Sequence, residues 1–146
     1  MTNNMEWLKK HLLTFYENNS LVTLLEMKIE KLDEGYVEIS MPIMLSKHTN
    51  INNVAHGGAL ASLADTIMGV ACAAHNKRVV TIEMNMNFIK AAVPQLKIRG
   101  IGKVIHAGKS TMVTEGQIID GQNNLIATAR GTFFVTGTFE EVDSEC

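Results

Sequence analysis

Asp65 is the only acidic residue in an eighteen-residue stretch, 56–73 (HGGALASLADTIMGVACA), that is otherwise mostly small or apolar. An ordinary solvated helix face carries several charges, whereas a lone carboxylate in apolar surroundings is costly to desolvate. Such isolation is typical of a side chain that is paired or used in chemistry. We therefore take Asp65 as the first candidate for a catalytic residue.

His56-Gly57-Gly58 stands where the helix that contains Asp65 is expected to begin. The first N–H groups of a helix have no partners within that helix and can hold a developing oxyanion. Gly57 and Asp65 are eight residues apart, which places them roughly 12 Å apart along one helix. Two antiparallel copies would bring the start of one helix beside the middle of the other, and closed two-fold dimers are the commonest oligomers. We therefore predict a site shared between the two chains of a homodimer.

Helical spacing gives this segment two different faces. One face is an apolar stripe made of Leu60, Leu63, Ile67, Val70 and Ala74. The other face places Asp65 among small residues, namely Gly58, Ala61, Gly69 and Cys72. Small residues would let a second backbone approach closely, but they would equally pack the helix under its own sheet. Both alternatives remain open at this stage.

The composition excludes several classes of protein. With 146 residues, of which 46% are hydrophobic, the chain has the size of one domain, and we expect a single domain over 1–146. A formal net charge of −2 gives no electrostatic footprint for nucleic acid or an anionic membrane as a partner. Cys72 and Cys146 form neither a disulfide framework nor a metal-ligand pattern. We therefore expect no metal site. Because two cysteines fit a reducing compartment and no leader or membrane-spanning run is recognisable, we also expect a cytoplasmic protein.

The first half of the chain predicts a second helix and a hairpin. Residues 5–17 are amphipathic with helical spacing, so we expect an N-terminal helix within 1–20 that packs on its own domain. Alternating residues over 25–42, around a turn at 33–35, predict two paired strands. The polar segment 43–55 is expected to be a loop that leads into the long helix.

The second half of the chain predicts four strands. The clearest is Val80–Phe88, where apolar residues alternate with polar ones and Thr81 falls on the polar face. Three more strands are expected at about 96–106, 110–119 and 124–137, before a flexible acidic tail over 140–146. The order predicts an α+β fold with an antiparallel sheet wrapped around a long central helix and an additional N-terminal helix. A helix laid across a flat sheet fits the periodicity almost as well.

One set of residues resembles a known family. Asn50, then His56-Gly57-Gly58, then Asp65 nine residues after the histidine, and then the alternating strand are similar to the PaaI-like branch of the hotdog-fold acyl-CoA thioesterases. The resemblance runs from about residue 46 to residue 134. It implies the hotdog fold, a homodimer with antiparallel central helices that is often paired into a homotetramer, and hydrolysis of acyl- or aryl-coenzyme A thioesters. No cofactor is implied, because coenzyme A belongs to the substrate.

The resemblance also implies a role for each matching residue. Asp65 would be the nucleophile or the general base that activates water, and the Gly57 N–H would polarise the thioester carbonyl. Asn50 would orient the attacking water or the carbonyl, and His56 would shape the turn near the thioester. The Thr81 hydroxyl would hold water near Asp65, although an ordinary polar strand residue fits that position too.

Gly108-Lys109-Ser110 resembles the turn with which related enzymes contact the nucleotide phosphates of coenzyme A. Lys90, just after the alternating strand, is a second candidate for the same contact. Either lysine could instead be a solvated surface residue. The chain departs from the family at Asn53, where glycine often stands three residues before the histidine. Asparagine also tolerates positive φ, so the turn is expected to survive.

Three other functions compete with the thioesterase interpretation. A hotdog hydratase or dehydratase also uses a histidine with a carboxylate, but the Phe-Pro-Gly context that follows the histidine in dehydratases is absent. A non-catalytic acyl-CoA-binding module would have no need for Asp65. A structural or partner-binding domain would pair Asp65 with a buried basic group such as His75 or Arg78.

Overall fold

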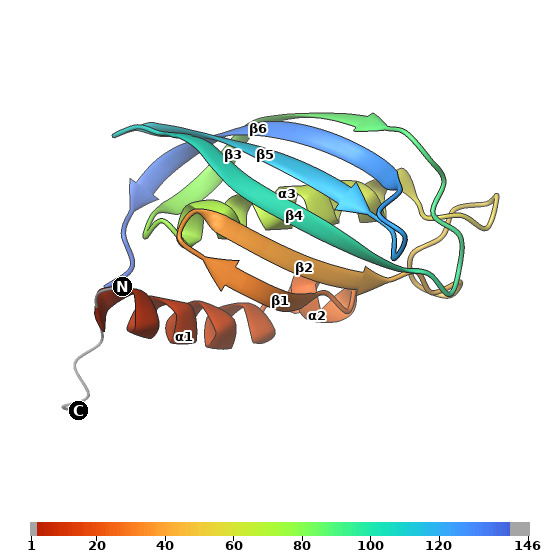
Figure 1. Ribbon diagram of the computed structural model, residues 1–146, viewed down its shortest axis with the longest axis horizontal. Helices are drawn as coiled ribbons and strands as arrows, with labels where there is room; N and C mark the ends of the chain where they lie inside the picture. Colours follow the sequence, from red (N-terminus) through yellow and green to blue (C-terminus); the bar gives the residue numbers. More distant parts are fainter. Residues whose placement is uncertain (1–2, 141–146) are drawn as a thin grey trace.

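One long helix, α3 (Gly57–Ala73), lies inside the curve of a six-stranded antiparallel sheet in the computed structural model, which describes residues 3–140 (Figure 1). The sheet has the strand order β1-β2-β4-β5-β6-β3. Its strands are β1 (Lys28–Asp33), β2 (Tyr36–Pro42), β3 (Arg78–Phe88), β4 (Lys97–Ala107), β5 (Thr111–Ile119) and β6 (Leu125–Gly137). Because the sheet curves around α3, which contacts β2, β3, β4, β5 and β6, the predicted curled α+β arrangement is confirmed and the flat one is wrong.

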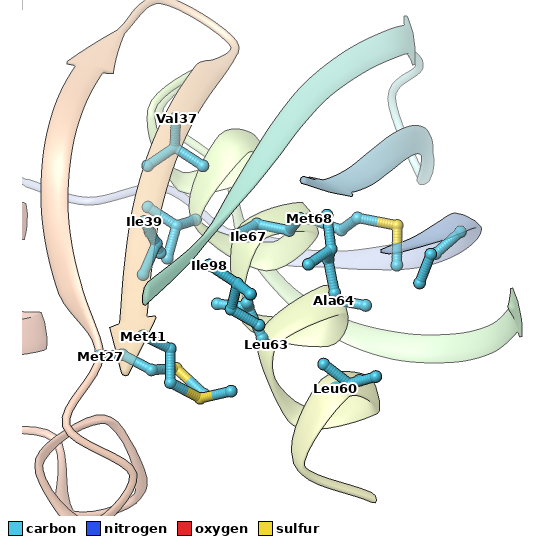
Figure 2. Packing of buried hydrophobic residues seen from close by; sticks show 14 of the residues in the cluster. Met27, Val37, Ile39, Met41, Leu60, Leu63, Ala64, Ile67, Met68 and Ile98 are labelled. Carbon is cyan, nitrogen blue, oxygen red and sulfur yellow. The ribbon is translucent and has the colours of Figure 1, made fainter. Parts of the chain in front are cut away.

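The apolar stripe predicted on α3 is the centre of the core. Leu63, Ile67 and Val70 are fully buried. Figure 2 shows Ile39 of β2 and Ile98 of β4 beside Leu63 and Ile67. Burial of each such side chain stabilises the fold by about 1.5–3 kcal/mol. Burial of this stripe is therefore the main interaction that holds α3 against the sheet.

A glycine of β4 lets the sheet approach the backbone of α3 closely. A Cβ atom built on Gly102 would lie 2.3 Å from the carbonyl oxygen of Ile67. Real Cβ atoms essentially never come so close to another atom, so any side chain here would push the helix away from the sheet. This contact fixes the distance between α3 and the middle of the sheet.

The N-terminal segment contains two helices where one was predicted. The first, α1 (Asn3–Glu17), ends as expected, but a short helix α2 (Ser20–Leu24) follows directly. The Asn19 side chain caps α2 by accepting hydrogen bonds from two of its backbone N–H groups. Glu26 then has a φ of 57°, which breaks the extended backbone, so the first strand of the hairpin begins at Lys28 rather than at Leu25.

The edge strand β3 contains a bulge that corrects the predicted position of Thr81. Thr81 pairs with Phe133 of β6, and Glu83 pairs with the next residue, Thr132, so Ile82 is the extra residue. Thr81 therefore shares the inner face of the sheet with buried Phe133, whereas Glu83 bonds Thr132 on the outer face. Strict alternation predicted that Thr81 shares the polar face of its strand with Glu83, but the bulge puts the two residues on opposite faces and turns Thr81 toward Asp65.

Within residues 3–140, no helix combines the length and the apolar character needed to cross a bilayer. The predicted flexible tail falls outside the described residues, except for Glu140.

Candidate active site

Asp65 and Thr81 meet on the inner side of the sheet. The Thr81 hydroxyl donates a 2.7 Å hydrogen bond to Oδ1 of Asp65. The small-residue face of α3 directs Asp65 toward β3, and the bulge turns Thr81 toward the helix. The carboxylate is half-buried, and it has no ion pair with any residue that the structure describes. Asp65 thus keeps its second oxygen, Oδ2, available for a proton or a reacting atom.

This pair lies in an open groove of about 500 Å³ between α3, β3 and the N-terminal helices. Gly69 and Ala73 of α3 form part of the floor of this groove. Cys72, on the same small-residue face of the helix, is instead fully buried. Aromatic side chains line much of the rest: Phe15, Tyr16, Phe133 and Phe139. Burial raises the pKa of Tyr16 to about 12, so its hydroxyl remains protonated in neutral solution.

His56 and Gly57 form the start of α3. His56 is the N-cap, and its Nδ1 accepts a 2.7 Å hydrogen bond from the Gly58 N–H. The Gly57 N–H has no hydrogen-bond partner among residues 3–140. The Phe88 ring lies beside Gly57, 3.5 Å from the position of a Cβ built there. The start of α3 therefore presents a free N–H donor, which is what an oxyanion site requires.

Asn50 organises the loop before α3 through its side-chain oxygen. Its Oδ1 accepts hydrogen bonds from the N–H groups of Asn52 and Val54, at 2.9 and 3.3 Å. Asn53 adopts a φ of 60° within this turn, so asparagine replaces glycine there as predicted. The side-chain amide of Asn50 donates no hydrogen bond within residues 3–140 and remains a donor for a ligand.

Sequence reasoning missed the residue that holds this loop in place. His48 is fully buried; its Nδ1 accepts from the Met44 N–H, and its Nε2 lies 2.8 Å from the Leu25 carbonyl oxygen. The His48 carbonyl also accepts a 2.7 Å hydrogen bond from the His56 N–H. The sequence shows only one histidine in a polar loop, and nothing in it indicates that the side chain is buried and bonded to two separate backbone segments.

The candidate residues form two groups at different ends of the sheet. Gly57 lies beside Phe88 at the end of β3, and the Lys90 N–H bonds Ile126 just beyond it. Asp65 lies beside Thr81 near the start of β3. Phe88 is seven positions after Thr81 along β3, which corresponds to roughly 20 Å. One chain therefore does not bring Gly57 and Asp65 to the same substrate atom, in agreement with the helix spacing.

Lys109 belongs to the Asp65 end of the sheet. The turn that contains it closes with a hydrogen bond from the Gly108 N–H to the Thr111 carbonyl, and the Ser110 carbonyl accepts from the Val135 N–H. Lys109 itself is exposed and forms no ion pair within the described part of the chain. Lys90, by contrast, lies near Asp120 at the other end. The pKa of Asp120 is lowered mainly by hydrogen bonds from Asn124, and the Lys90 charge adds to that effect.

The model of the thioesterase superfamily matches residues 52–127, a range that includes Gly57, Asp65, Thr81 and Lys109. A protein of Archaeoglobus fulgidus that bears an esterase name is 34% identical over 119 residues, covering 82% of this chain and 77% of its own length.

The chain belongs to the thioesterase superfamily.

Solved relatives place this thioesterase more closely. The acyl-coenzyme A thioesterase PaaI of Escherichia coli is 30% identical over 128 residues, which are 86% of this chain and 87% of PaaI. The structure of E. coli PaaI superposes with a TM-score of 0.86 at 27% identity, covering 94% of this chain and 98% of that one. The protein is thus a PaaI-like thioesterase with the hotdog fold, as its sequence motifs indicated.

A protein of Streptococcus pneumoniae described as a hypothetical thioesterase, solved with coenzyme A, superposes with a TM-score of 0.75 at 28% identity, covering 78% of this chain and 91% of that one. Two more structures of the S. pneumoniae protein carry an Asp-to-Ala and a Thr-to-Ala replacement sixteen residues apart. Asp65 and Thr81 of this thioesterase have the same spacing.

The structure also decides one of the competing interpretations. His75 lies 3.6 Å from Glu34, and the Arg78 guanidinium lies over the Phe139 ring, so neither basic group pairs with Asp65. Within residues 3–140, Asp65 therefore does not form the structural ion pair with His75 or Arg78 that this interpretation expected. No cluster of three or more potential metal ligands occurs within residues 3–140.

Proposed function

We propose that this thioesterase hydrolyses acyl- or aryl-coenzyme A thioesters to the free acid and coenzyme A. The observation that carries the proposal is the hydrogen-bonded Asp65–Thr81 pair, which lies in a groove large enough for an acyl group. The name of E. coli PaaI and the coenzyme A in the S. pneumoniae structure support the choice of coenzyme A thioesters.

In the proposed reaction, the Asp65 carboxylate acts on the carbonyl carbon of the thioester. As a general base it takes a proton from water while the water oxygen attacks that carbon; as a nucleophile it forms an anhydride that water then cleaves. In both routes the carbon–sulfur bond breaks, and the coenzyme A thiolate leaves. The Thr81 hydroxyl orients the carboxylate, and an unpaired backbone N–H stabilises the carbonyl oxygen as its negative charge grows.

The N–H donor is proposed to come from Gly57 of a second copy. Within residues 3–140, the edge strand β3 pairs only with β6 and leaves its other edge open, and Val80, Ile82 and Phe88 are more than half exposed. Antiparallel pairing of two β3 strands, centred between Met84 and Asn85, would set Thr81 of one chain near Phe88 of the other. Gly57 of that second chain would then lie near Asp65, which accounts for the two separate groups of residues. A further pairing into tetramers is expected from the family resemblance.

The same pairing suggests roles for the remaining candidates. Asn50 and His56 would join Gly57 on the second copy, where the free Asn50 amide could hold the water or the carbonyl. Lys90 of the second copy would come to the end of the sheet where Lys109 lies. Both lysines could then contact the phosphates of one coenzyme A as flexible point charges.

Steady-state hydrolysis of short, medium, long and aromatic acyl-CoA thioesters tests this proposal. The Asp65→Asn variant should lose orders of magnitude in kcat because its amide cannot accept the proton. Glu83→Gln is the matched control, because Glu83 also accepts a hydrogen bond from a threonine, but on the outer face. Full activity of Asp65→Asn, or binding of every thioester without turnover by the unmodified protein, would contradict the proposal and favour an acyl-CoA-binding module.

A further inference from the structure

The groove that contains Asp65 has opposite charges at its two ends. Three ionisable carboxyl or basic side chains line it: Asp65, Lys77 and Arg78. Asp65 lies at one end of the groove. Lys77 and Arg78 lie at the other end, where Lys77 is in the segment between α3 and β3 and Arg78 is the first residue of β3. From Asp65 to Ala73, the floor of the groove extends about 12 Å along the helix. A substrate whose carbonyl lies at Asp65 and whose acyl group follows this floor would place the far end of that group near Lys77 and Arg78.

Neither basic side chain has an acidic partner within residues 3–140. Lys77 is half-buried, although a charged side chain without a partner normally stays in water. The Arg78 guanidinium lies 4.8 Å from the centre of the Phe139 ring. Stacking of this kind leaves the N–H groups on the edge of the guanidinium free, and their fork geometry matches a carboxylate.

Tyr16 adds a neutral donor at the same end. Its ring lines the groove, and its hydroxyl forms no hydrogen bond with any residue that the structure describes. Tyr16 and Arg78 line the same groove. The distal end thus offers an ammonium, a guanidinium and a hydroxyl, while aromatic side chains enclose the path from Asp65.

We infer that this end of the groove is a subsite for an anionic group at the distal end of the acyl chain. The preferred substrates would then be monothioesters of dicarboxylic acids with roughly six to eight carbons, a length that spans the groove in extended form. This inference rests on the proposed hydrolysis of coenzyme A thioesters. It goes further by assigning Lys77 and Arg78 as specificity-determining residues.

Matched substrates test the subsite. Octanoyl-CoA and suberyl-CoA have the same chain length and differ by the terminal carboxylate. A charge-assisted hydrogen bond is worth about 1.5–3 kcal/mol, so kcat/KM should be at least about tenfold higher for suberyl-CoA. In the Lys77→Gln/Arg78→Gln variant this ratio should fall by about tenfold. Lys103→Gln, which removes a basic residue from the exposed part of β4, should leave the ratio unchanged.

Lys77→Gln alone serves as the second variant, because it retains the stacking of Arg78 on Phe139, and it should lower the ratio in part. A ratio near one in the unmodified protein, or a high ratio that neither variant lowers, would overturn the subsite. Hydrolysis of octanoyl-CoA that depends on Asp65 would still support the proposed function in that case. Absence of hydrolysis of either thioester would overturn the function and the subsite together.

Discussion

Replacement of Thr81 by valine tests whether the hydrogen bond to Asp65 contributes to catalysis. Valine keeps the shape of the side chain and removes the donor that lies 2.7 Å from Oδ1. A hydrogen bond to a charged acceptor contributes about 1.5–3 kcal/mol, and partial exposure to water reduces this to about 1–2 kcal/mol. We therefore expect kcat for acyl-CoA hydrolysis to fall about five- to thirtyfold.

Thr132→Val is the matched control. Thr132 is paired with the β3 residue Glu83 and donates a 3.0 Å hydrogen bond to its carboxylate, so the same chemical change is made at another threonine–carboxylate pair, but on the outer face. Its kcat should stay within about twofold of that of the unmodified protein, and Thr81→Ser should recover most of the lost activity. Equal kcat values for Thr81→Val and Thr132→Val, with both proteins folded, would refute the role assigned to Thr81.

Three further predictions concern stability and reactivity. Gly102→Ala should lower the free energy of unfolding by about 1–3 kcal/mol in denaturant titrations, because its Cβ would meet the Ile67 carbonyl oxygen, whereas Gly121→Ala, with open space around it, should change little. The pKa of Asp120 is lowered by hydrogen bonds in the folded state, so its stabilising contribution is present above the ordinary pKa of aspartate. Melting temperatures measured from pH about 5 downward should therefore fall less in Asp120→Asn than in the unmodified protein. Burial raises the pKa of the Cys72 thiol, so iodoacetamide should alkylate this thiol only after the protein unfolds. Mass spectrometry of the peptide that contains Cys72 measures the alkylation.

The order of elements could be predicted from the sequence because their patterns are local. The apolar stripe on α3 fits only a helix with one side against a sheet, and its members are buried as expected. Turns were marked by polar and glycine residues, and the last three strands begin and end within one residue of their predicted limits. Helix geometry alone also predicted that Gly57 and Asp65 of one chain lie too far apart to act on one substrate atom, and the structure places them beside opposite ends of β3.

Other features depend on contacts between distant segments and leave no local trace. The bulge at Ile82 has no glycine to mark it, yet it determines that Thr81 faces Asp65. The five residues of α2 are too few to show a helical period. Tyr16 fits an ordinary amphipathic helix, and only the folded chain shows that it lines the groove beside Asp65.

A dimer assembled from two different variants tests the shared site most directly. One chain carries Asp65→Asn and the other Gly57→Pro, which removes the N–H donor. Proline suits the first position of a helix, and His56 before it has φ −65° and ψ 137°, a conformation that precedes proline readily. Each variant alone should be inactive as a folded dimer.

Co-expression with two different affinity tags isolates the mixed dimer. If each site combines Asp65 of one chain with Gly57 of the other, the mixed dimer contains one intact site and should show about half the kcat per dimer of the unmodified protein. If both groups acted within one chain, neither site would be intact. A mixed dimer as inactive as its parents would therefore contradict the shared site.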